Sequence, residues 1–473
     1  MRLIDCRRFS PALIGALAAF LLVARGGALA KGAAEGVDRP PPHPAGPVAF
    51  VDVRLYDSDA QRFLEHRTVV VSEGRIAAQG PAASTPPPAG ARVIPGSGKT
   101  LLPGLWDGHM HVRDDRTATL LLSQGVTSVR EMGSPPEDLL ARKRRIDRDE
   151  LLGPRIVPML LIDGPGRYSN EYALVVRTVA EVLAAVHRAK AEGYAGIKVY
   201  GSLAAELLAP IAKETETLGL RLLGHVPRTL RPLDALRLGF DEITHINFVL
   251  MQAMPDSVVQ GTEGPLRWYG PAKLGPAVDF AGRPMKSLLD EMVRRGTAVD
   301  PTLSVFESTW MPDRKELPPA FASFVGTLPE ALEEELRGMS APTLRDVTRA
   351  DFRAGFAKLK ALVGELHRRK IPILAGTDGH GLELVRELEL YVEAGLTPAE
   401  ALATATIVPA RTLGFGSESG SLAVGKRAEL ILVDGDPSRR IGDLRKVEVV
   451  MRDGRLMQAA ELRAAAGLAG GPR

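Results

Sequence analysis

Two histidines with one residue between them, His109 and His111, follow an apolar stretch that begins at Leu101. The stretch has the pattern of a buried strand: an apolar run closed by Pro-Gly, then a second short apolar segment. Residues two apart on a strand point to the same side, so both imidazoles could bind one metal ion. The pair alone also fits two ordinary polar residues at a strand end, and a metal site needs further ligands.

Four more residues that can bind metals fall at the ends of other apolar segments: Lys198, His225, His245 and Asp378. The carboxyl ends of parallel strands meet at one face of a barrel, where barrel enzymes keep their chemistry. Each of these residues alone could be structural, such as an ion-pair partner or a core histidine. Together with the histidine pair they predict a shared metal site at that face.

Eight apolar segments separated by helical segments predict the barrel that would bring these residues together. The strands are expected at 105–112, 127–133, 155–163, 196–201, 221–227, 242–248, 298–305 and 371–378. The gaps after the sixth and seventh strands, 249–297 and 306–370, are long. Loops that follow strands build the active-site face of a barrel, so we expect these two insertions to select the substrate.

Short strand patterns at both ends of the chain predict a second, smaller domain. The fold class is therefore α/β: a (β/α)8 TIM-type barrel over 101–415, with a small β-sandwich domain built from 47–100 and 416–460. A Pro/Gly/Ala-rich linker is expected at 31–46 and a flexible tail at 461–473.

The first 30 residues are typical of a secretory signal peptide, with arginines, then an apolar core, then Ala28-Leu29-Ala30 as a cleavage site. We therefore expect an exported protein, periplasmic or secreted. The formal net charge of +3 comes entirely from this segment, so nothing favours nucleic acid or a membrane surface as a partner. The only cysteine, Cys6, also lies here, and no later stretch approaches the roughly 20 apolar residues of a spanning helix.

The motifs around these residues resemble the metal-dependent amidohydrolase superfamily, and within it the imidazolonepropionase-like and Xaa-Pro dipeptidase (prolidase) branch. Their order and spacing carry the resemblance: SEGRIAAQG, LLPGLWDGHMHV, GVTSVREMG, GIKVYG, GHVP, THINF, AGTDGHG, EAGLTPAEALATATIVPARTLG and GSLAVGKRAELILVDGDP. Two positions depart from the family pattern, since Val226 replaces a frequent Ala or Gly and Thr244 replaces a frequent Glu. Neither change touches an expected ligand.

The resemblance implies two divalent metal ions. His109, His111 and Asp378 would hold the more buried ion, and His225 and His245 the more exposed one. Imidazole and carboxylate ligands suit zinc, with manganese, iron or cobalt as alternatives.

The resemblance also implies that Lys198 bridges both ions as a carbamate formed with carbon dioxide. An ammonium group is a cation without a lone pair, whereas a carbamate offers two anionic oxygens. A hydroxide between the ions would attack a substrate carbonyl, and Asp378 would move the proton to the leaving nitrogen as general acid/base.

We expect hydrolysis of an amide C–N bond in a small molecule, a dipeptide or an N-acyl amino acid. Three residues near strand ends, Arg130, Tyr200 and His380, could orient that substrate or serve the fold. Alternatives are a mononuclear cyclic amidase resembling imidazolonepropionase, against which Lys198 argues, a lactone or organophosphate hydrolase, and a catalytically silent binding protein. The sequence also allows a homo-oligomer and does not decide the oligomeric state.

Overall fold

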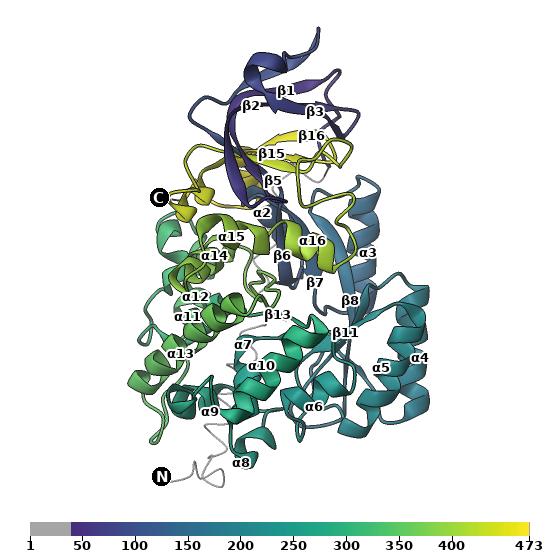
Figure 1. Ribbon diagram of the computed structural model, residues 1–473, viewed down its shortest axis with the longest axis vertical. Helices are drawn as coiled ribbons and strands as arrows, with labels where there is room; N and C mark the ends of the chain where they lie inside the picture. The colour runs from purple at the N-terminus through teal and green to yellow at the C-terminus, as the bar shows by residue number, and fades with distance from the viewer. Residues whose placement is uncertain (1–38, 473) are drawn as a thin grey trace.

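The computed structural model describes residues 39–472, so the predicted signal peptide and the first half of the predicted linker lie outside the described residues. Two bodies of strands are stacked along the long axis of the molecule (Figure 1). The smaller one, at the top, combines the purple N-terminal and yellow C-terminal strands. The larger one below it is a barrel with helices on its outside.

Parallel strands form the wall of the barrel in the order β6-β7-β8-β10-β11-β12-β13, which confirms the predicted fold class. Most of these strands have three to six residues, and β8 has nine. A two-residue strand, β9, pairs with β8 from the loop that follows it. The bounds are β6 Leu105–Met110, β7 Val126–Glu131, β8 Arg155–Asp163, β9 Leu174–Val175, β10 Gly196–Val199, β11 Arg221–Gly224, β12 Glu242–Thr244 and β13 Ala298–Asp300.

The eighth predicted strand, 371–378, is present only as an extended segment that closes the barrel between β13 and β6. Val299 and Ile373 form a single isolated bridge, and on the other side the Gly108 N–H donates to Ala375 O at 2.7 Å. Two residues explain the sparse pairing. Pro372 has no N–H to donate, and a Cβ on Gly376 would lie 2.6 Å from the Cβ of His109, so the backbones approach too closely for a regular ladder.

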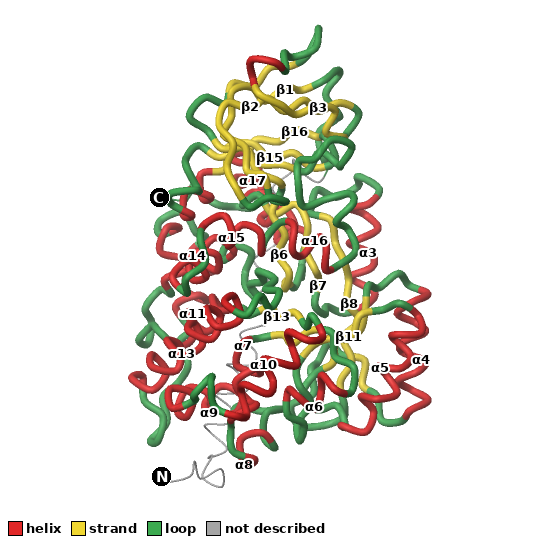
Figure 2. The backbone as a smooth tube through the Cα atoms, viewed as in Figure 1, coloured by secondary structure: helices red, strands yellow, loops and turns green. Residues whose placement is uncertain are grey.

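Helices follow most strands and cover the outside of the barrel (Figure 2). Several begin at a capping box, such as that of Thr178 with Glu181 at α4. No helix of the described residues is both long and apolar enough to cross a membrane. The α-helices are α2 Asp115–Ser123, α3 Pro136–Asp147, α4 Val179–Ala191, α5 Leu208–Leu218, α6 Pro232–Arg237, α7 Ile246–Leu250, α8 Asp256–Val259, α9 Leu266–Leu274, α10 Arg283–Arg295, α11 Leu303–Trp310, α12 Glu330–Arg337, α13 Arg349–Arg368, α14 Leu384–Glu393, α15 Pro398–Thr404, α16 Ile407–Thr412 and α17 Ala459–Ala465. Short 3-10 helices are η2 Ala82–Ser84, η3 Ala205–Leu207, η4 Met251–Ala253, η5 Gly275–Ala277, η6 Pro319–Phe324 and η7 Ile441–Lys446.

Strands from both chain ends form one mixed sheet in the order β16-β15-β14-β5-β1-β2-β3, with β4 paired to β1. Strand β5 joins the two ends, because it pairs parallel with β1 and antiparallel with β14. The face of the sheet buries an apolar cluster that includes Phe50, Val69, Leu101, Leu430 and Val449. The bounds are β1 Val48–Asp57, β2 Arg62–Ser72, β3 Arg75–Pro81, β4 Arg92–Pro95, β5 Thr100–Pro103, β14 Leu430–Val433, β15 Val447–Arg452 and β16 Arg455–Gln458.

The C-terminal segment is packed, which corrects the predicted flexible tail at 461–473. Helix α17 lies against α2 and β15, and Leu462 and Leu468 are 2% and 5% exposed. Ala466 and Leu468 join an apolar cluster with Phe321 and Phe324. Ala459, Leu462 and Ala466 recur at helical spacing and are buried, so α17 is held against its neighbours.

Candidate metal centre

Three of the predicted ligands, His109, His111 and Asp378, converge at the mouth of the barrel. His109 is the second-last residue of β6 and His111 follows the strand directly, while Asp378 comes from the segment that closes the barrel. The Oδ1 of Asp378 lies 3.1 Å from the Nε2 of His111 and 3.6 Å from that of His109. The Asp378 N–H donates to His109 O at 2.7 Å, which fixes the two segments together. Ligand atoms of all three residues lie within 4.8 Å of one another, as a metal site requires.

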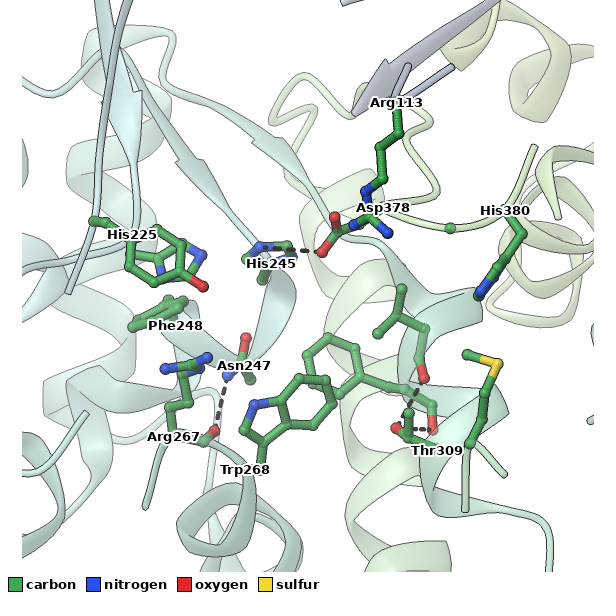
Figure 3. A pocket seen from close by; sticks show the side chains of 15 residues that line it. Arg113, His225, His245, Asn247, Phe248, Arg267, Trp268, Thr309, Asp378 and His380 are labelled. Atoms are coloured by element: carbon green, nitrogen blue, oxygen red, sulfur yellow. Dashed lines mark hydrogen bonds and ion pairs between the residues drawn. The ribbon is translucent and has the colours of Figure 1, made fainter. Parts of the chain in front are cut away.

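Each of three histidines uses its Nδ1 for a hydrogen bond within the protein. The partners are Asp300 Oδ2 for His109 at 2.9 Å, Gly133 O for His111 at 2.9 Å and Thr302 Oγ1 for His245 at 2.8 Å. Such bonds fix the orientation of an imidazole ring and leave Nε2 to bind a metal. His245 Nε2 lies 3.8 Å from Asp378 Oδ2, the contact marked in Figure 3. Burial lowers the pKa of His245 to about 3, so the ring is neutral and keeps a lone pair.

The fourth histidine, His225, follows β11 and has no hydrogen-bond partner at either ring nitrogen among the described residues. Its ring centroid lies 4.9 Å from that of His245, and the ring stacks on Tyr200 at 3.9 Å. Burial lowers the pKa of His225 well below its ordinary value. A buried, neutral imidazole without a hydrogen-bond partner fits the role of a metal ligand, because an unsatisfied buried polar group is otherwise costly.

Lys198, in β10, reaches the same centre. The side chain is buried, and Nζ lies 3.0 Å from the Nε2 of His109. No carboxylate of residues 39–472 forms an ion pair with it within 4.0 Å. Burial lowers the pKa of Lys198, which favours the neutral amine. The six predicted ligands are therefore brought together, and the chemistry of the set fits metal binding.

Arg130 does not line the pocket, and its contacts fit the structural alternative of the two roles suggested for it. It is fully buried in β7 beneath the histidines, where it donates to both oxygens of Glu242 at 2.8 and 2.5 Å. Its Nη2 also donates to Asp300 Oδ2 at 2.9 Å. Asp300 in turn accepts from His109 and from the His245 N–H. The guanidinium therefore holds the carboxylate that orients two ligands.

Residues 100–457 match the amidohydrolase family. The chain belongs to this family. Solved structures of the same fold include a Xaa-Pro dipeptidase with bound methionine, 20% identical with a TM-score of 0.64, matched over 87% of this chain and 100% of that one. An A. niger ochratoxinase is 19% identical with a TM-score of 0.62, matched over 87% and 96%.

Curated relatives match only short stretches of this amidohydrolase-family chain. A 5'-deoxyadenosine deaminase from Methanobrevibacter smithii is 36% identical over 96 residues, 18% of this chain and 22% of that protein. An N-substituted formamide deformylase from Arthrobacter pascens is 44% identical over 62 residues, 13% and 11% of the two chains. The chain therefore spans about a fifth or less of the length of these relatives.

A pocket opens over the centre of this amidohydrolase-family protein (Figure 3). Tyr200 and His380, two of the three suggested substrate contacts, line it together with His225, His245 and Asp378. Both long insertions also reach it, as expected. The other lining residues are Arg113, Asn247, Phe248, Arg267, Trp268, Val305, Phe306, Thr309, Met339 and Gly379.

His380 is tied to the second insertion. Its Nδ1 lies 3.1 Å from Glu383 Oε1, and its Nε2 lies 3.7 Å from Glu335 Oε1 in α12. Although burial lowers the pKa of His380, the two carboxylates raise it to about 9. The ring is therefore a paired cation that connects α12 to the edge of the pocket.

Sequence reasoning missed two groups of residues at the centre. Asp300 is the last residue of the seventh strand, and a carboxylate at the end of a barrel strand is a sequence feature that could have indicated its place at the centre. Arg113 and Arg267 lie outside regular motifs, and Arg267 belongs to an insertion whose path only the structure shows.

Proposed function

We propose that this chain is an exported, binuclear metal-dependent amidohydrolase that hydrolyses the amide C–N bond of a dipeptide or an N-acyl amino acid. One observation carries the proposal: His225 is buried, and neither ring nitrogen has a partner among the described residues. Its ring centroid lies 4.9 Å from that of His245, which lies 4.7 Å from that of His109. The likeness to the Xaa-Pro dipeptidase fold supports the choice of substrate class.

Five side chains would each bind one of two metal ions, and Lys198 would bridge both ions. His109, His111 and Asp378 would hold one ion, and His225 with His245 the other. Two divalent ions held there, with zinc suiting the imidazoles and the carboxylate, would supply Lewis acidity and would lower the pKa of a water from about 15.7 toward roughly 7.

Lys198 has the properties that carbamate formation needs. Its buried amine is held toward the neutral state, and only a neutral amine has the lone pair that bonds the carbon of carbon dioxide. The nitrogen loses one proton in that step, and the product is an anion. Burial lowers the pKa of His109 and of His225, so these rings supply no negative charge to the site. A carbamate on Lys198 would supply the negative charge that two bound cations need.

Asp378 is placed to move the proton of the reaction. Although burial raises its pKa, His109 and His111 lower it well below the ordinary value, so the carboxylate is ionised and can accept a proton. The side chain reaches into the pocket that lies over the ligands. We expect it to take the proton of the attacking water and return it to the leaving nitrogen.

Replacement of Asp378 by Asn tests this role. Asp378 has φ of +49°, a conformation that Asn also tolerates, so the variant should fold. Loss of the acid/base group should lower kcat about 100-fold or more on any amide that the zinc-loaded wild type hydrolyses. The measurement uses a panel of dipeptides, N-acetyl amino acids and lactones, with melting temperature as the check on folding.

Asp147→Asn is the matched control, since Asp147 lies at the exposed end of α3 and its ion pair within residues 39–472 is with Lys143. It should keep wild-type kcat. Unchanged turnover in Asp378→Asn would contradict the acid/base role, and absence of hydrolysis of every amide by the zinc-loaded wild type would contradict the proposed function.

A further inference from the structure

Helix α9, in the first long insertion, places a buried cation in the pocket wall. Arg267 is only 5% exposed, yet no ion pair within 4.0 Å involves it among residues 39–472. The one hydrogen bond of its guanidinium within that part of the chain runs from Nη1 to the backbone oxygen of Glu263 at 2.8 Å. A guanidinium carries five N–H donors, so most of its capacity is unused.

The nearest acidic side chains are already engaged elsewhere. Glu263 directs its carboxylate to Arg228, at 3.0 Å. Asp163 accepts backbone hydrogen bonds from Gly164, Asn170 and Ser202. Burial raises the pKa of Asp163 to about 6 even though Arg267 opposes the rise, which does not fit a close ion pair between them.

The ring of Tyr200 lies between the guanidinium of Arg267 and His225, a candidate metal ligand. The Cζ of Arg267 is 5.8 Å from the ring centroid of Tyr200, whose other neighbour is the stacked ring of His225. Beside it stands an apolar wall, in which the rings of Trp268 and Phe306 are 5.0 Å apart. Figure 3 shows Arg267, Trp268 and His225 around the same cavity. A cation, an apolar wall and the metal ligands therefore face one space.

We propose that Arg267 binds the free carboxylate of the substrate, and that Trp268 and Phe306 contact an apolar group of the same molecule. This inference rests on the proposed function. Burying a charge without a counter-ion is costly, and a carboxylate offers the planar pair of acceptors that matches a guanidinium. In an N-acyl amino acid the carboxylate lies two bonds from the scissile nitrogen, so one molecule can reach both the ligands and Arg267.

The substrate class follows from this anchor. Acids should be preferred over the neutral amides of the same compounds, because the amide leaves the buried cation without a partner. Selection therefore acts on the charge of the substrate and on an apolar group, both through residues of the two insertions.

The test compares N-acetyl-L-leucine with N-acetyl-L-leucinamide, which differ only at that carboxyl group: the amide is neutral and has one acceptor oxygen in place of two. Titration calorimetry measures their binding to the metal-free protein, so the readout does not depend on turnover. Wild type should bind the acid about tenfold to a hundredfold more tightly than the amide, as a charge-assisted hydrogen bond predicts. Arg267→Gln should abolish the difference, and Arg267→Lys should retain part of it because the charge remains.

Arg228→Gln is the matched control, since Arg228 is a half-exposed arginine of the same region whose partner is Glu263. It should keep the preference. Equal affinity for acid and amide in wild type, binding of neither, or a preference that survives Arg267→Gln overturns the inference. A preference that Arg267→Gln removes, in a protein that hydrolyses no amide when loaded with zinc, supports the anchor and contradicts the proposed hydrolysis.

Discussion

Two buried polar side chains near the centre differ in what their burial achieves. His225 has unpartnered ring nitrogens among the described residues, a cost that only a metal or another ligand would offset. Arg130 is as deeply buried but fully engaged, with Glu242 and Asp300 as counter-ions. The unpartnered ring of His225 can bind a ligand but lowers stability without one, whereas Arg130 holds the candidate metal ligands in place through Asp300.

Removal of the guanidinium of Arg130 should be strongly destabilising. Arg130→Met leaves two carboxylates buried without their cation, and loss of one partner from a buried ion pair costs about 3–5 kcal/mol. Chemical unfolding of the metal-free protein measures the change. Arg294→Met, which breaks an exposed ion pair with Glu291 in α10, is the control and should leave stability almost unchanged. An equal effect of the two substitutions would contradict the structural role of Arg130.

The candidate ligands of the centre could be named from sequence, whereas the residues that support them could not. His109, His111 and Asp378 sit in motifs whose order along the chain carries information. Asp300 and Arg267 act through contacts with residues far away in sequence, and no local pattern encodes such contacts. The same limit explains Arg130, whose place near a strand end was visible but whose partners were not.

At the scale of elements, the barrel strands were predictable as apolar segments, and their ends were not. The predicted strands ran on through residues that the structure places after β10, β11 and β12, because apolar character continues past the last ladder hydrogen bond. The segment 371–378 looked like a strand for the same reason. Its Pro372 and the close approach of Gly376 to His109 limit the pairing it can form.

The position of α9, which carries Arg267, depends on a close helix contact. A Cβ on Gly355 of α13 would lie 2.7 Å from the Cα of Ala272 in α9. Gly355→Ala should therefore push α9 aside, raise KM for an N-acyl amino acid and lower stability by about 1–3 kcal/mol through overpacking. Steady-state kinetics and thermal unfolding measure the two effects.

Gly364→Ala is the control from the same helix. Its added Cβ would meet the backbone oxygen of Ala394 at the end of α14, on the side away from α9. We expect it to lower stability and leave KM unchanged. If both substitutions changed KM alike, general loosening of the protein, and not the position of α9, would be the cause.

At the scale of the whole molecule, the proposed ions connect strands that the backbone joins only through neighbours. The ligands come from β6, β10 and the segments after β11, β12 and the closing stretch 371–378, so bound metal should stabilise the barrel as a unit. A ligand present at 100 times its Kd adds about 2.7 kcal/mol. Metal removal by a chelator should thus lower the melting temperature.

Lys198→Ala should weaken this effect, because the bridge between the two ions is lost. Metal analysis should find about two ions per chain in wild type and one or fewer in the variant, with a smaller rise in melting temperature on adding zinc. Lys213→Ala, on the exposed face of α5, should behave as wild type. Two ions retained in Lys198→Ala would show that no carbamate bridge is needed, and one ion in wild type would favour the mononuclear alternative.

The sheet shared by the two chain ends restricts the order in which its strands can pair. Thr100, which begins β5, donates its hydroxyl to Gly435 O, a partner 335 residues away. While the chain is being made, β1 and β2 can pair early, but the other edge of β5 must wait for β14. An open strand edge is a template for wrong pairing. Pairing in the small domain can therefore begin before the barrel is made, but it is complete only after β14 is made. A chain that stalls before β14 would leave the edge of β5 unpaired and open to pairing with another chain.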